Sequence, residues 1–232
     1  MKKLAPILIV LLSINLNAQS KSELQKHFEA YYQEMRLQAD VSGVISALTH
    51  LNVIAPSKER RDTLAYIYMN NNQHLQALNT IGIEKNPEDS DLAVQVKAVS
   101  LKSINQPQRA LEQFKVLYER NPNPFLAYEI ADLQIQTGDT DGAAINIEYG
   151  LANSQDDMKH AFFERQQPYE VSLKAAFLHL KGLLVFNQDK NNIEQAIGFM
   201  DEALKLEPSF NLASLSKQAL ESRKNEGETE GN

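Results

Sequence analysis

The sequence predicts an all-α protein built from antiparallel helix hairpins, and three observations support this fold class. Small residues recur at a step of 33, at Ala77, Ala110 and Ala143, with Val44 one step before them. The apolar residues around them follow helical spacing. Only 9 of the 232 residues are glycine, and helix-forming residues dominate the composition. Repeats of this length are typical of helical arrays, which act by presenting a binding surface.

The expected helices follow one another along almost the whole chain. They cover residues 20–38, 40–54, 58–71, 73–84, 89–104, 107–119, 124–137, 141–153, 168–187, 192–206 and 209–223. Acidic and hydroxyl residues at 88–91 and 139–141 are suited to cap the helices that follow them. Pro122 and Pro208 cannot continue a helix and therefore mark helix ends. We find no strand signals.

The helices pair. Twelve positions before three of the small residues lies another small residue, within a preceding helical run; these are Ala65, Ala98 and Ala131. Small side chains on both helices allow two antiparallel helices to approach closely. Each repeat is therefore expected to be one helix hairpin.

The repeated pattern resembles that of the tetratricopeptide repeat (TPR) family. The copies that carry the resemblance are Leu64-Ala65, Tyr68, Ala77 and Ile81; then Ala98, Leu101, Ala110, Phe114 and Pro122; then Ala131, Gly138-Asp139, Ala143 and Ile147; and finally Gly182, Ala196, Met200, Ala203 and Pro208. A divergent first copy passes through Tyr32, Val44, Leu48, Leu51 and Pro56. The resemblance covers Leu24 to Leu220 and implies a right-handed superhelical TPR-like α-solenoid.

The repeats depart from the family pattern in identifiable places. Their step is 33 instead of the usual 34, and the tryptophan position of the pattern is never filled. Lys97 occupies a position that the pattern gives to a large apolar residue, and Glu84 replaces a small one. The repeats are degenerate, and we expect a repeat domain over residues 19–223.

The first eighteen residues have the features of a signal peptide. Lys2 and Lys3 precede an uncharged run to Ala18 whose apolar part is too short to span a membrane. Cleavage after Ala18 would export the mature protein to the periplasm or the outside of the cell. The alternative is an uncleaved N-terminal anchor.

Composition limits the class of partner. The chain has no cysteine, so a lipid attachment site and a disulfide framework are both excluded. Removing Lys2 and Lys3 lowers the number of Lys and Arg from 23 to 21 against 30 Asp and Glu, which gives a net charge of −9. A chain this acidic is expected to repel nucleic acid and anionic lipid.

The sequence gives only weak evidence for a catalytic or metal-binding site. The five histidines are scattered without metal-ligand spacing, and we find no phosphate loop or nucleophile elbow. A calcium loop could be drawn from Thr137 to Glu148, but its first ligand is missing and Asp139 serves equally as a helix cap. We expect no enzyme activity, cofactor, metal or small-molecule substrate.

The TPR resemblance also implies which residues face the concave groove, since the first helix of each pair lines it. The expected groove residues are Asp62, Tyr66, Met69, Asn70, Gln95, Val99, Lys102, Tyr128, Asp132 and Ile135. Tyr66 and Tyr128 would act as aromatic anchors, or alternatively would pack between neighbouring first helices. Asp62 and Asp132 oppose an acidic ligand, so an apolar or basic peptide is favoured over a C-terminal carboxylate.

These observations predict a protein- or peptide-binding adaptor of the bacterial cell envelope. The alternative is a constitutive structural subunit of an envelope or secretion assembly.

Two regions depart from the repeat. An excess of about 20 residues falls near 155–170 and contains Phe162, Phe163 and Tyr169. This insertion could be a binding flap, although burial of its rings against the array is favoured. The polar tail 224–232 is expected to be disordered.

Overall fold

The computed structural model describes residues 20–230, and their side chains as far as Glu226. The chain divides into an N-terminal unit that ends at Ile83 and a C-terminal unit that begins at Glu84. The predicted signal peptide lies outside the described residues. Within residues 20–230 we find no helix long and apolar enough to cross a membrane.

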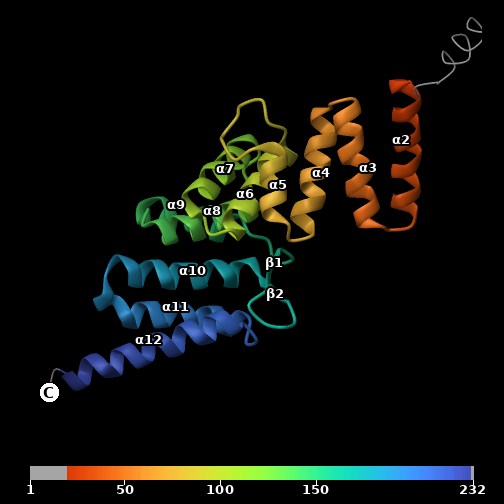
Figure 1. Cartoon of the computed structure of the whole chain (residues 1–232). Helices are drawn as coiled ribbons and strands as arrows, with labels where there is room; N and C mark the ends of the chain where they lie inside the picture. The colour runs from red at the N-terminus through yellow and green to blue at the C-terminus, as the bar shows by residue number, and fades with distance from the viewer. Residues whose placement is uncertain (1–19, 231–232) are drawn as a thin grey trace, which may run out of the picture. The chain divides into compact units, whose positions relative to one another are not determined.

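Neighbouring helices pack in pairs within each unit, as the sequence predicts (Figure 1). The N-terminal unit contains α2 (Lys21–Leu37), α3 (Val41–Ile54), α4 (Lys58–Asn70) and α5 (His74–Ile81). The C-terminal unit contains α6 (Asp91–Ser103), α7 (Pro107–Arg120), α8 (Pro124–Thr137), α9 (Thr140–Asn153), α10 (Leu173–Gln188), the short 3-10 helix η2 (Lys190–Asn192), α11 (Ile193–Leu206) and α12 (Asn211–Glu230). The repeated alanines Ala65, Ala77, Ala98, Ala110, Ala131 and Ala143 are all fully buried.

The turn inside each of the first four helix pairs has the same geometry. Its central residue adopts a left-handed conformation, and these residues, Ala39, Asn72, Asn105 and Gly138, are spaced by 33. The next N–H closes the helix end by donating to a carbonyl five residues earlier, as Asp139 does to Gln134. The repeat is therefore visible in the backbone as well as in the buried alanines.

Helix α5 is shorter than predicted. It ends at Ile81, whereas the sequence pattern extends it to residue 84. Gly82, at φ 84°, ends the helix in a conformation that side chains disfavour. Residues 82–90 then form an irregular segment where the other repeats continue the second helix.

A buried ion pair holds residues 84–89 of this segment against α6, within the C-terminal unit. The ammonium of Lys97 donates to the Asp89 carboxylate at 2.5 Å and to the Glu84 carbonyl at 2.7 Å. Lys97 is 2% exposed, so it fills the apolar position of the repeat with its methylene stem. Arg120 donates to the Asp89 carbonyl and to the Asp91 carboxylate.

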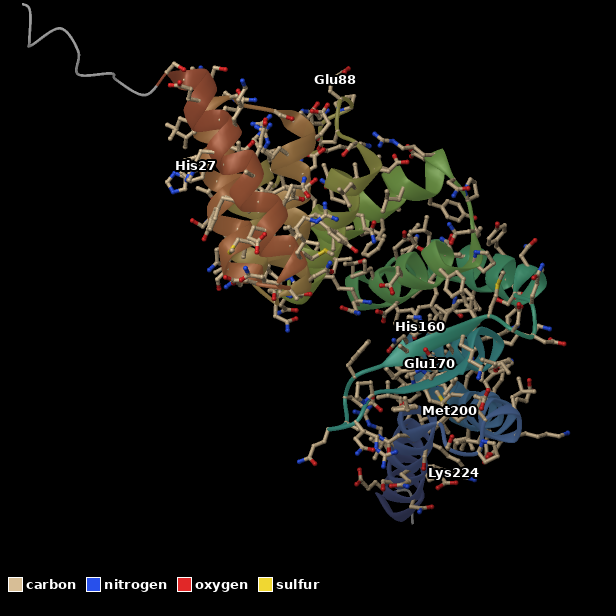
Figure 2. All side chains as sticks on the ribbon, turned by 90° about the vertical axis from the view of Figure 1, so that its right-hand side faces the viewer. His27, Glu88, His160, Glu170, Met200 and Lys224 are labelled. Atoms are coloured by element: carbon tan, nitrogen blue, oxygen red, sulfur yellow. The ribbon has the colours of Figure 1, made fainter. Side chains whose placement is uncertain are left out.

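The insertion near residues 155–170 is a β-hairpin, which corrects the expectation of helices alone. Strand β1 (Lys159–Phe162) pairs antiparallel with β2 (Tyr169–Ser172), with Phe162 opposite Tyr169. Figure 2 shows the two strands side by side, marked by His160 and Glu170. Helix α10 therefore begins at Leu173 and not at the predicted residue 168, because residues Tyr169–Ser172 form β2.

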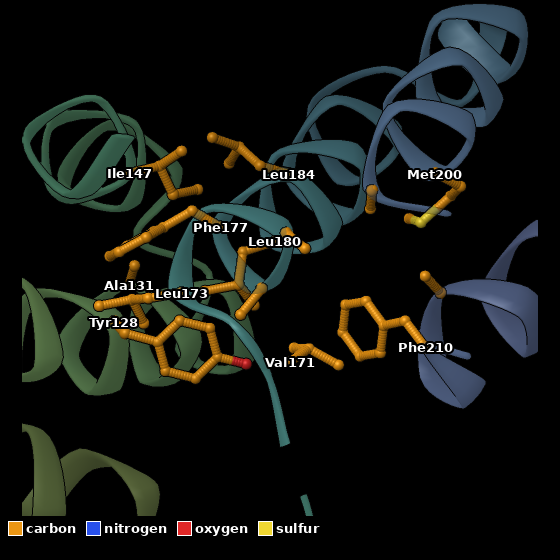
Figure 3. Packing of buried hydrophobic residues seen from close by; sticks show 14 of the residues in the cluster. Tyr128, Ala131, Ile147, Val171, Leu173, Phe177, Leu180, Leu184, Met200 and Phe210 are labelled. Carbon is orange, nitrogen blue, oxygen red and sulfur yellow. The ribbon is translucent and has the colours of Figure 1, made fainter. Parts of the chain in front are cut away.

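The hairpin belongs to a hydrophobic core of the C-terminal unit. Phe162 is buried there with Val171, Leu173, Phe177 and Phe210. Figure 3 shows the last four of these residues. Gly150 of α9 admits the ring of Phe177 so closely that a Cβ at this glycine would lie 1.9 Å from it. The prediction that the inserted rings are buried is confirmed for Phe162, whereas Phe163 is 74% exposed.

Helix α12 is longer than predicted. It runs to Glu230, through most of the tail that we expected to be disordered from residue 224. Lys224 forms an ion pair with Glu194 of α11, which fixes this part of the helix to its neighbour. An ion pair across two helices cannot be recognised from the composition of a polar tail.

Candidate functional site

The structure distributes the predicted groove residues over the two units. Asp62, Tyr66, Met69 and Asn70 lie on α4 of the N-terminal unit, and the other six lie on α6 and α8 of the C-terminal unit. We therefore describe each unit separately.

Only part of the predicted α4 surface is accessible. Asp62 and Met69 are buried at 5% and 7% exposure and cannot line an open groove, which corrects the prediction for both. Tyr66 and Asn70 are exposed. Because residues three and four apart share one helix face, Thr63 continues this face toward the start of α4.

A hollow of about 330 Å³ lies at that end of the face. This hollow, called here the N-terminal hollow, is formed by α2, α3 and the start of α4; its lining includes Glu29, Tyr32, Leu48, Leu51, Glu59 and Arg60. Leu48 and Leu51 are buried, so they supply an apolar floor. The volume is at the lower end of the range for ligand pockets, about 300 to 1,000 Å³.

The charged side chains around the N-terminal hollow differ in how free they are to contact a ligand. Arg60 donates through Nη1 to the carbonyls of Leu51 and Ala55, at 3.2 and 2.6 Å, and so satisfies the end of α3. Glu29 and Glu59 are exposed. The hydroxyl of Ser57 donates to Glu59 and lowers the pKa of its carboxyl, which keeps it ionised. The rim therefore favours a cationic group beside an apolar one.

In the C-terminal unit, the predicted groove residues Lys102 and Asp132 neutralise each other. The Lys102 ammonium donates to Glu129 at 2.7 Å and to Asp132 at 2.9 Å. Burial lowers the pKa of Lys102, but the charges and hydrogen bonds of the two carboxylates outweigh burial and raise it overall. Of the remaining predicted residues, Gln95 is exposed, while Val99 and Ile135 are half-buried.

Tyr128 is covered by the hairpin and cannot act as an accessible anchor. Its ring lies 4.2 Å from that of His160 on β1 and packs edge-on against Phe162 and Phe177. Burial raises the pKa of Tyr128 well above its ordinary range, with the charges of Asp132 and Glu129 adding to the effect. Figure 3 shows Tyr128 within this cluster. The insertion thus occupies the part of the surface that the repeat pattern assigns to a ligand.

Hydrogen bonds tie the two ends of the loop between the strands, and the loop presents an exposed aromatic ring. The Tyr169 hydroxyl donates to Glu164 and accepts from the N–H of Leu212, while Asn211 also donates to Glu164. Burial raises the pKa of Tyr169 to about 12, helped by the hydrogen bond to Glu164. The guanidinium of Arg165 lies over the Tyr169 ring. Phe163 and Arg165 lie on either side of the hydrogen-bonded Glu164, and the two residues are called here the hairpin tip.

The segment weighed as a calcium loop is a helix cap. Asp139 accepts from the N–H of Gly142 at 3.0 Å and from the side chain of Gln134 at 2.7 Å. Glu148 lies on α9 and pairs with Lys181. Among the side chains that the structure describes, which end at Glu226, we find no cluster that could hold a metal ion.

Comparison with known proteins identifies the fold. Neither a family model nor a curated protein matches the sequence. Among solved structures, the chain is similar to the MamA protein, with a TM-score of 0.58 and 16% identity, covering 81% of this chain and 93% of that one. It is also similar to YrrB, described as a TPR protein with an unusual peptide-binding site, with a TM-score of 0.63 and 13% identity, covering 90% of this chain and 97% of that one. The chain therefore has the fold of the tetratricopeptide repeat proteins.

Proposed function

We propose that this chain is a protein- or peptide-binding adaptor of the bacterial cell envelope. The observation that carries the proposal is the open surface of the N-terminal unit, where the exposed α4 residues Tyr66 and Asn70 continue toward the N-terminal hollow. An exposed tyrosine beside an apolar floor and a polar rim is suited to holding an extended segment of another protein.

The similarity to YrrB supports a peptide as the kind of partner, because that protein is described as having a peptide-binding site. The acidic rim favours a segment with a cationic residue. In the C-terminal unit, the hairpin covers Tyr128, so we assign binding to the N-terminal unit.

The sequence supports an exported location. Lys2 and Lys3 followed by a short apolar run and Ala18 are the features on which this part of the proposal rests. Cell fractionation and N-terminal sequencing of the mature protein test it. A mature protein that begins at Gln19 in the periplasm or medium is expected, and a cytoplasmic protein with an intact N-terminus would refute it.

Binding can be tested with an array of short peptides, with affinities measured by fluorescence polarisation on the full chain. We expect Tyr66→Ala and Glu59→Lys each to weaken the selected peptides about tenfold. Two matched controls are available. Phe125 is an exposed ring on α8 and Glu112 an exposed carboxylate on α7, so Phe125→Ala and Glu112→Lys should leave affinity unchanged.

Equal losses in the test and control variants would refute a site in the N-terminal unit. A constitutive assembly subunit, the alternative function, predicts instead that the purified chain selects no peptide and is recovered from cells only within a large complex.

A further inference from the structure

The hairpin tip and the N-terminal hollow have complementary chemistry. The tip presents one aromatic ring, Phe163, and one cationic group, Arg165. The hollow offers an apolar floor with two exposed carboxylates, Glu29 and Glu59, at its rim. A ring on the floor and a guanidinium at the rim would satisfy both surfaces.

The ring of Phe163 is accessible to another protein surface. It is 74% exposed, although its neighbour Phe162 is buried in the core. Its loop is braced by the hydrogen bonds among Glu164, Tyr169 and Asn211, so little conformational entropy would be lost on docking. Aromatic and arginine side chains on a rigid support are the residue types that dominate binding energies at interfaces.

We propose that the N-terminal hollow binds the hairpin tip of a second copy of this chain. This inference rests on the proposed function, because it names the occupant of the same hollow. The contact is heterologous, since two different surfaces meet, and a pair of copies keeps one free tip on one copy and one free hollow on the other. Association can therefore continue head to tail beyond two copies.

The size of the two surfaces sets the strength of the contact. A six-residue loop in a hollow of about 330 Å³ buries far less than the roughly 1,000 Å² expected of a stable interface. The association should be weak and concentration-dependent, in the manner of a transient assembly.

Sedimentation of the chain without the predicted signal peptide tests the proposal, at concentrations from about 5 to about 500 µM. The weight-average mass of the wild type should rise with concentration. Phe163→Ser, which alters only an exposed ring, should weaken association about tenfold, and Arg165→Glu should also weaken it. Phe125→Ser is the matched control and should change nothing.

Mixing two defective variants gives the sharpest readout. Phe163→Ser lacks a tip but keeps its hollow, while Glu29→Lys/Glu59→Lys lacks the acidic rim but keeps its tip. Each alone should associate more weakly than the wild type, and their mixture should form a complex of one copy of each that grows no further, because only one intact tip and one intact hollow fit. Combining Arg165→Glu with Glu59→Lys in one chain should restore association relative to either change alone.

Three outcomes would overturn the proposal: a wild type that is monomeric throughout, association that Phe163→Ser leaves intact, or a compact monomer whose hydrodynamic size depends on Phe163 but not on concentration. The last would show that the tip docks within its own chain. If the wild type is monomeric while array peptides still bind in a Tyr66-dependent way, the proposed function stands and only the self-association fails.

Discussion

The ion pair between Lys97 and Asp89 offers the most direct test of how the degenerate repeat is stabilised. Lys97 is 2% exposed and the Asp89 side chain 9%, with 2.5 Å between Nζ and the carboxylate oxygen. Replacing Lys97 with Met keeps an unbranched apolar stem but leaves a buried carboxylate and the Glu84 carbonyl without a donor. Breaking one side of a buried pair costs about 3 to 5 kcal/mol.

A double-mutant cycle separates the pair from its surroundings. Asp89→Ala should also cost about 3 kcal/mol, because it leaves the buried ammonium unpaired. In the double variant Lys97→Met/Asp89→Ala no buried charge remains, so the total loss should be only about 1 to 2 kcal/mol. The coupling free energy between the two sites is therefore large, because the double variant loses much less stability than the two single variants added together.

Urea denaturation followed by circular dichroism measures these free energies of unfolding, with hydrogen exchange of the α6 amides as a local readout in case the two units unfold separately. The result that would refute this reasoning is a Lys97→Met variant within about 0.5 kcal/mol of the wild type, since that is the effect of an ordinary surface substitution.

Three further predictions concern the packing around Gly150, the titration of His179 and the backbone conformation of Ala39. Gly150→Ala places a methyl group against the buried Phe177 ring and should destabilise the chain by about 1 to 3 kcal/mol, whereas Gly198→Ala, whose Cβ meets nothing within 4 Å, should stabilise α11 by up to about 1 kcal/mol; equal effects in thermal unfolding would contradict this packing argument. Burial lowers the pKa of His179 from 6.5 to about 4, so its contribution to stability is complete above pH 6.5 and is lost as the pH falls toward 4, about 3 kcal/mol in all. His179→Gln should remove that part of the pH dependence, and an unchanged difference in unfolding free energy between about pH 7 and about pH 4.5 would show that His179 does not titrate in this way. Ala39, at φ 54°, lies in a conformation that favours glycine, so Ala39→Gly should raise the free energy of unfolding by about 1 kcal/mol; a lower value would mean that the turn is not strained.

The helices could be predicted because their determinants are local. Buried alanines at a step of 33, capping residues such as Ser90 and Asp139, and Pro122 after α7 each act within a few residues of the chain. The boundaries predicted from them agree with the structure within one or two residues for most helices.

The features that were missed depend on contacts between distant residues. The strands of the hairpin have four residues each, too few for a periodic pattern, and Phe162 is covered by Tyr128 on α8 and by Phe210 just before α12. Lys97 stood out as a departure from the repeat, but its partner Asp89 lies in an irregular segment that no pattern connects to it.

The same distinction between local and distant contacts explains why only part of the candidate site was predicted. Register along α4 identified Tyr66 and Asn70 as exposed positions, because the repeat fixes how each helix is turned. Register could not show that an insertion would cover Tyr128, since that depends on how the inserted residues fold.

The hairpin also changes how the C-terminal unit is expected to unfold. In a simple repeat array each hairpin of helices contacts only its neighbours, so repeats can be removed from an end one at a time. Here the N–H of Ser172 donates to Glu207, and Tyr169 accepts from Leu212, which links the hairpin to residues 35 and 43 positions further along the chain. Truncation before Phe210 would therefore remove the ring that packs against Phe162. We therefore expect the hairpin and the helices that follow it to unfold together, and to fold more slowly than a plain array of the same length, because the links join residues far apart in the sequence.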